Sequence, residues 1–163
     1  MSWRGSTTVK DRIFACLPYL LPLVEVVIYG GPLFLQFPPL QLIFQPLIIF
    51  SGFYYAIARS FPLGLGGLII FFALFMLVVR NERLPHFIRF NTMQAILLDI
   101  VVILCSILLQ LIGITGNSFA IQTLATTIFL GIVAASVYSI VQSLFGRYAE
   151  IPAISDAVYM QVR

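Results

Sequence analysis

The sequence predicts an all-α protein that crosses a membrane several times. Of its 163 residues, 61% are hydrophobic and only 9% are charged, and the mean hydropathy is +1.06. Soluble domains carry about 25% charged residues, and a chain this short cannot hide so much apolar surface in one core. The apolar runs are continuous, whereas a transmembrane barrel alternates polar and apolar residues over segments of about ten. Helices remain, because they satisfy every backbone group inside lipid.

Five apolar segments approach the roughly 20 residues that span a bilayer. They cover residues 13–30, 40–57, 61–80, 93–113 and 119–144. We expect a single helical membrane domain over residues 13–145, a short N-terminal tail at 1–12 and a C-terminal tail at 146–163. The opening residues MSWRGSTTVKDR do not resemble a targeting segment.

The basic residues predict how many segments cross, because cytoplasmic loops are enriched in Lys and Arg. One basic group precedes the first segment, a second separates the third from the fourth, and a third follows the fifth. An even number of crossings therefore precedes residue 80, and we expect four transmembrane helices plus one interfacial or re-entrant helix. Both termini should lie on the cytoplasmic or stromal side. The three groups are Arg4, Lys10 and Arg12; Arg80, Arg83 and Arg89; and Arg147 and Arg163.

The non-crossing segment is one of the first two. Segment 13–30 contains Pro18, Pro22 and Glu25; a buried acid costs about 2.5–3.5 kcal/mol, and interior prolines kink helices. We therefore favour an interfacial or re-entrant 13–30. The alternative has almost equal support: segment 13–30 spans, and 40–57, which Pro46 interrupts, does not.

Residues 80–91 form a basic elbow between two apolar segments. Pro85 suits the first turn of a new helix, and a helix from His86 can continue into the fourth apolar segment. If Arg83 is also helical, it shares a polar edge with His86 and Arg89. We favour a loop that orients the helices and binds anionic lipid, and the alternative is a contact with a partner or a passing polypeptide. The candidate contact residues are Arg80, Asn81, Arg83, His86, Arg89 and Asn91.

A polar stripe begins at Thr92 and runs through Asp99, Ser106 and Gln110 of the fourth apolar segment. Such residues face a bundle interior or a water-filled path. Glu25 is the other acid within an apolar run. Hydrogen bonding between helices and a hydrated pathway are equally supported.

The fifth segment carries small residues at every fourth position, a pattern that allows close helix packing. They are Thr123, Thr127, Gly131, Ala135, Ser139 and Ser143.

The sequence offers little for catalysis or cofactors. One histidine and two distant cysteines do not suggest a metal site, and we find no phosphate loop or paired nucleophile and base. We expect no enzyme activity, cofactor or metal, and no nucleic-acid partner, since the basic residues form no stripe.

Several motifs resemble one known family. They are RIFACLPYLLPLVEVVIYG, LFLQFP, VVRNERLPHFIRFNTMQAILLDI and YSIVQSLFGRYAEIPAISDAVYMQVR, which together extend from about residue 11 to the end. This chain resembles the twenty-kilodalton subunit of the translocon at the inner chloroplast envelope, in its cyanobacterial or plastid-encoded form. The resemblance implies four membrane helices, stromal termini and a role in protein import as a channel or channel-forming component.

We therefore expect an integral membrane subunit of a protein-import translocon, in the chloroplast inner envelope or the cyanobacterial plasma membrane. Expected partners are membrane lipid, other translocon subunits and a transit polypeptide, in a homo- or hetero-oligomer. The alternatives are a small-solute or ion transporter and a scaffold subunit that conducts nothing.

Overall fold

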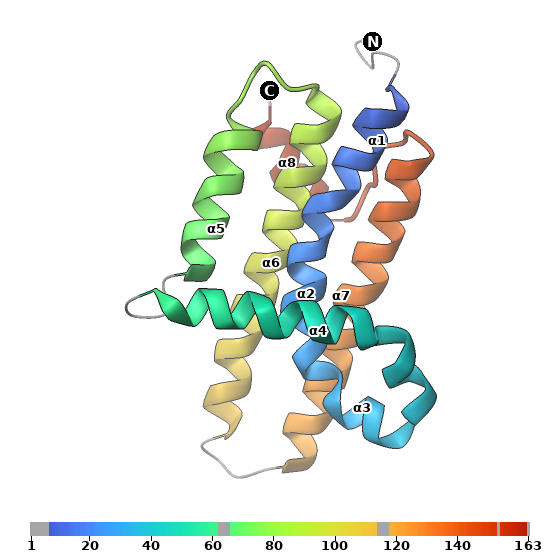
Figure 1. The fold of residues 1–163 in the computed structure, drawn as a ribbon, viewed down its shortest axis with the longest axis vertical. Helices are drawn as coiled ribbons and strands as arrows, with labels where there is room; N and C mark the ends of the chain where they lie inside the picture. Colours follow the sequence, from blue (N-terminus) through green and yellow to red (C-terminus); the bar gives the residue numbers. More distant parts are fainter. Residues whose placement is uncertain (1–6, 62–65, 114–117, 153, 163) are drawn as a thin grey trace.

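The computed structural model describes residues 7–61, 66–113, 118–152 and 154–162, and most of these residues are helical. No strand occurs among these residues, so the all-α prediction is confirmed (Figure 1). The elements in chain order are α1 (Val9–Cys16), η1 (Leu17–Tyr19), α2 (Leu20–Val26), η2 (Val27–Gly30), α3 (Gly31–Gln36), α4 (Pro38–Ser60), α5 (Gly66–Leu74), η4 (Phe75–Val79), α6 (His86–Gly113), α7 (Ser118–Leu144) and α8 (Ile154–Gln161).

Four helical stretches are long and apolar enough to cross a bilayer, and a shorter apolar helix covers Gly66–Val79. This agrees with the predicted four long helices and one further element. The chain is a multi-pass membrane protein. The four stretches are Val9–Gln36, Pro38–Ser60, His86–Gly113 and Ser118–Leu144.

The first stretch stays helical through its prolines. A reciprocal capping box starts it: the Thr8 backbone nitrogen donates to Asp11 Oδ2 over 2.9 Å, and the Asp11 nitrogen donates to Thr8 Oγ1 over 3.2 Å. Pro18 and Pro32 occupy the first turns of η1 and α3, where their missing N–H groups cost little. The stretch between the first two apolar segments, residues 31–39, is therefore mostly helix, and only Phe37 separates α3 from α4.

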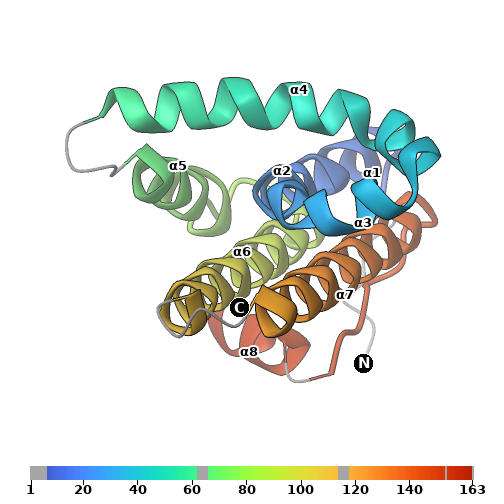
Figure 2. The same ribbon diagram turned by 90° about the horizontal axis from the view of Figure 1, so that it is seen from below.

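Helix α4 runs across the bundle, whereas α1–α2, α5, α6 and α7 follow its long axis (Figure 1). Seen from below, α4 forms an outer layer over α2 and α5 (Figure 2). Its most apolar 18-residue window is 6% buried, against 50% for the window within Val9–Gln36. This differs from the favoured arrangement with 13–30 at the interface and is closer to the alternative, in which 13–30 spans the membrane and 40–57 does not. The first stretch stays helical because Pro18 lies in the 3-10 turn η1 and Pro22 lies in the first turn of α2.

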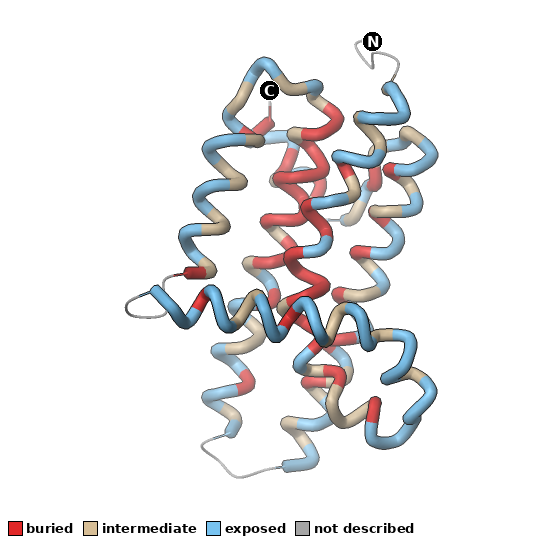
Figure 3. The backbone as a smooth tube through the Cα atoms, in the orientation of Figure 1, coloured by how far each residue is buried: buried red, intermediate tan, exposed pale blue. Residues whose placement is uncertain are grey.

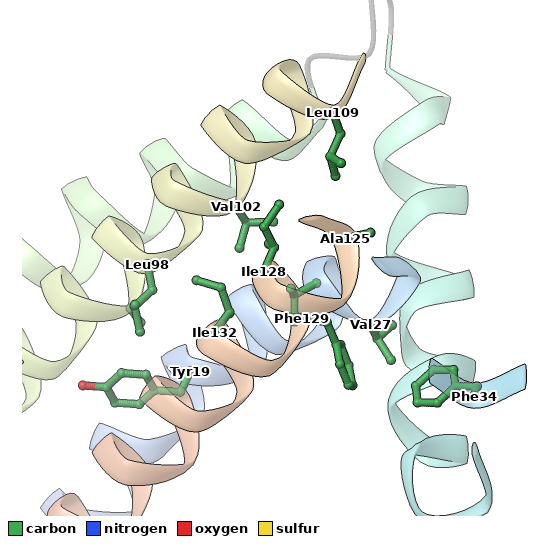
Figure 4. Close-up of a cluster of buried hydrophobic side chains, with 12 residues drawn as sticks. Tyr19, Val27, Phe34, Leu98, Val102, Leu109, Ala125, Ile128, Phe129 and Ile132 are labelled. Carbon is green, nitrogen blue, oxygen red and sulfur yellow. The ribbon is translucent and has the colours of Figure 1, made fainter. Parts of the chain in front are cut away.

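Buried residues gather on α2 and on the first half of α6 (Figure 3). The larger apolar cluster joins η1, α2, η2 and α3 to α6 and α7, and Figure 4 shows Leu98 and Val102 of α6 near Ile128 and Ile132 of α7. Its aromatic part is a set of rings from three helices, in which the centroids of Phe34 and Phe44 lie 5.4 and 5.2 Å from that of Phe129. Such tilted contacts stabilise aromatic pairs beyond their burial.

A second apolar cluster joins the start of α6 to η4 and the C-terminal segment. Its buried members are Val79, Phe90, Met93, Ile96, Val158 and Val162. The chain reaches this place after Gly146, which follows α7 with a φ of 71°. A glycine tolerates this left-handed conformation without strain. The C-terminal tail predicted at 146–163 thus packs against the bundle and contains α8.

Candidate functional site

The basic elbow is a turn followed by a helix, and the C-terminal segment covers part of it. Arg83 lies in the turn, where its backbone nitrogen donates to Asn81 Oδ1 over 3.1 Å. Its shared helical edge with His86 and Arg89 is therefore not formed, but the helix does begin at His86 as expected. Arg80 and Arg83 are exposed at this end of the bundle.

His86 and Arg89 both contact their own chain. His86 Nδ1 lies 3.1 Å from Tyr148 Oη, and its Nε2 lies 3.4 Å from the Val162 carbonyl oxygen. Arg89 Nε donates to the Val79 carbonyl over 2.8 Å, which fixes the elbow against the end of η4. Of the elbow's three arginines, Arg80 and Arg83 are thus the ones exposed to lipid headgroups or partners.

Asn91 lies in the core and not at the interface where the sequence predicted it. Its side chain is fully buried. Asn91 Oδ1 accepts hydrogen bonds from Tyr19 Oη over 2.9 Å and from Ser143 Oγ over 2.8 Å, and its Nδ2 donates to the Phe87 carbonyl. This polar centre links η1, α6 and α7, and each of its groups is satisfied.

Asp99 and Glu25 meet inside the bundle. Asp99 is only 2% exposed, Glu25 is half-buried, and their side chains are neighbours inside the bundle. Tyr54 Oη donates to Glu25 Oε1, and Tyr55 Oη donates to the Glu25 carbonyl oxygen over 3.3 Å. The acid pair therefore joins α2 and α6 to the crossing helix α4.

The predicted polar stripe is interrupted below Asp99. Thr92 is buried and donates to the Ile88 carbonyl, but Ser106 is half-buried and donates to the Ile103 carbonyl of its own helix. Gln110 is exposed. From His86 to Val102 the neighbouring helices cover most of α6. In the rest of α6, from residue 103 to Gly113, Leu109 alone is buried.

Three buried polar residues escaped the sequence reasoning about a pathway. Gln94 and Ser136 were not singled out, and Ser139 was considered only for packing. All three side chains are fully buried, and their polar atoms lack protein partners. Gln94 lies five residues before Asp99, a spacing that does not place two side chains on one helix face. The sequence pattern does not reveal that these three positions are buried, and burial is what marks them as unusual.

The small-residue ridge of α7 turns from the surface into the core. Ser139 and Ser143 are buried and Ala135 is half-buried, while Thr123, Thr127 and Gly131 are exposed. A four-residue repeat drifts around a helix of 3.6 residues per turn, so the ridge packs inside this chain along its last third only.

The surface of the described residues includes an apolar groove and a polar groove. An apolar groove of about 430 Å³ lies between α1–α2, α5 and α6, and Leu17, Leu74 and Leu84 are among its lining residues. A polar groove of about 270 Å³ lies between α3 and α7 at the end opposite the elbow. It is lined by Pro32, Gln36, Phe119, Gln122, Thr123, Thr126 and Thr127.

A family model described as "Chloroplast import apparatus Tic20-like" matches residues 8–158. A "Tic20 family protein" from Synechocystis is 46% identical over 165 residues, covering 100% of this chain and 99% of the relative. "Tic20 family protein Ycf60" from Gracilaria tenuistipitata is 34% identical and covers 95% of this chain and 76% of its own length. "Protein TIC 20-v, chloroplastic" from Arabidopsis thaliana is 31% identical, covering 96% and 73%.

Proposed function

The chain belongs to the Tic20-like family of the chloroplast import apparatus, and we propose that it is a membrane component of a protein-import translocon. The extent of the family match carries this proposal. It covers residues 8–158, from the capping box of α1 into α8, and so includes every long apolar helix. The membrane is the chloroplast inner envelope or the cyanobacterial plasma membrane, and both termini lie on its stromal or cytoplasmic side.

A polypeptide path has to form between this chain and its neighbours. Buried side chains fill the space between α2, α6 and α7. The chain therefore acts in an oligomer or beside partner subunits and contributes one wall of the path.

The polar groove between α3 and α7 is the best-placed part of such a wall. Gln122, Thr123 and Thr127 are exposed there on a helix that crosses the membrane, and Gln110 is exposed near the end of α6. Polar side chains that meet lipid are unfavourable, so such a face is expected to contact water or another chain.

Site-specific crosslinking tests the proposal. A photoreactive amino acid at Gln122 or Thr127 should form adducts with a precursor arrested during import. The same probe at Ile43, on the exposed face of α4, is the matched control and should give mainly lipid adducts. Adducts at neither groove position would remove the conducting role.

A scaffold subunit that conducts nothing is the second candidate, and the closed interior favours it. In that case Gln122 and Thr127 should crosslink to the same partner subunit whether or not a precursor is present.

A further inference from the structure

The acid pair occupies a point where four helices meet. Glu25 comes from α2, Asp99 from α6 and Tyr54 from α4. Gly67 of α5 closes the fourth side, because a Cβ built on it would lie 3.2 Å from Tyr54 Oη and 3.9 Å from Glu25 Oε1. A side chain at residue 67 would crowd this point. Glycine leaves the room in which the two acids and Tyr54 lie together.

Two neighbouring carboxyl groups can share a hydrogen bond only when one of them carries a proton, since carboxylate oxygens only accept. Two ionised acids this close repel, and burial among apolar helices strengthens that repulsion. One proton held between Glu25 and Asp99 would remove this repulsion. Asp99 Oδ1 remains buried without a protein partner.

Further unpartnered polar atoms lie between this pair and the Asn91 centre. Gln94 Nε2 and Oε1, Ser136 Oγ and Ser139 Oγ are all buried and lack protein partners. Since α6 and α7 are antiparallel and the Asn91–Ser143 hydrogen bond fixes their register, Gln94 lies level with Ser139, and Asp99 with Ser136, to within a residue. The rise along α6 from Asn91 to Asp99 is about 12 Å.

Buried polar atoms are normally hydrogen-bonded, and internal water serves where protein groups do not. We propose that Glu25 and Asp99 form a proton-binding site inside the membrane domain, and that internal water along Gln94, Ser136 and Ser139 connects this site to the Asn91 centre. Release of the proton into this water leaves two carboxylates in contact. Their repulsion weakens the packing of α2 against α6. It also affects α4, because Tyr54 of α4 donates a hydrogen bond to Glu25. The proposal stands whether or not the chain conducts polypeptides.

The ionisable groups nearest the pair are three tyrosines: Tyr54 and Tyr55 of α4 and Tyr29 of η2. Arg59 of α4 lies near Tyr55, and Cys105 of α6 lies near Tyr29. Within the described parts of α5 and α7, no acidic, basic or histidine side chain faces the pair.

Infrared spectroscopy of the full chain in lipid nanodiscs at neutral pH tests the site. The chain has only six Asp and Glu residues in all, so a C=O band of a protonated carboxylic acid can be assigned with few variants. The wild type should show this band, and both Glu25→Gln and Asp99→Asn should remove or shift it. Glu82→Gln, which changes an exposed acid in the elbow, is the control and should leave the band unchanged.

Exchange into D₂O tests the water. The band should move to lower frequency, because exchangeable water reaches the pair. A wild-type spectrum without the band, or a band unchanged in either variant, overturns the proton site; a band that does not move in D₂O overturns the water connection. If the acid variants fail to fold, Tyr54→Phe keeps both carboxyl groups and should shift the band, and an unchanged band would overturn the site.

Discussion

His86 Nδ1 lies 3.1 Å from Tyr148 Oη, across a sequence separation of 62 residues. This contact holds the C-terminal segment against the basic elbow. A second contact joins α1 to the end of α7, since Arg12 Nη1 donates to the Leu144 carbonyl over 3.4 Å. The start of α1, the elbow and the C-terminal segment therefore lie at one end of the bundle (Figure 1).

Labelling of introduced cysteines should find these parts on one side of the membrane. In a background with Cys16 and Cys105 replaced by alanine, we expect Arg83→Cys and Asp156→Cys to react with a membrane-impermeant maleimide from the same side. Gln122→Cys, at the other end of α7, should react only from the opposite side. Reaction of Arg83→Cys and Asp156→Cys from opposite sides would contradict the crossing number.

Loss of the Asn91 side chain should destabilise the bundle. Asn91→Ala leaves the hydroxyls of Tyr19 and Ser143 without their acceptor, and each unpaired buried group costs about 1–3 kcal/mol. Thermal unfolding of the purified protein in detergent measures this as a lower midpoint. Gln110→Ala, on the exposed part of the same helix, is the control. Equal midpoints for the two variants would contradict a structural role for the Asn91 centre.

The sequence predicted the helical class, the apolar segments and the start of α6 at His86, since these depend on composition and local signals. It misplaced Asn91 because residues next to a basic elbow resemble an interface, and only the packing of α7 and η1 shows that this position is buried. The sequence reasoning used Glu25 as an argument against a spanning helix and also grouped it with Asp99 as a candidate pathway or interhelical residue. Its partner Asp99 comes from a segment more than 70 residues away, and sequence alone cannot pair the two.

Removal of one hydroxyl should loosen α4. Tyr54→Phe deletes the hydrogen bond to Glu25 Oε1 and keeps the ring. A hydrogen bond to a charged group contributes about 1.5–3 kcal/mol, so amide hydrogen exchange across Pro38–Ser60 should become faster. Tyr55→Phe is the matched control, because its longer bond of 3.3 Å reaches only a backbone carbonyl and its loss should have the smaller effect. A larger effect of Tyr55→Phe would show that the Glu25 carboxyl group is not the main anchor of α4.

Two glycine substitutions should act in opposite directions within the monomer. Gly146→Ala places a Cβ on a residue with a φ of 71°, at a distance of 3.0 Å from Arg12 Nε. A left-handed non-glycine residue costs about 1–2 kcal/mol, so the unfolding midpoint should fall and the contact between α1 and the end of α7 should weaken. Gly131→Ala meets no atom within 4 Å, and alanine favours helix over glycine by about 1 kcal/mol. The isolated chain with this change should therefore be as stable as the wild type or more so.

If the exposed part of the small-residue ridge packs against a second copy or a partner, Gly131→Ala should instead reduce assembly, because the added methyl group separates the two backbones. Unfolding in detergent and crosslinked oligomer yield in vesicles, measured on the same variant, separate these effects. An unchanged yield would mean that this face of α7 meets lipid.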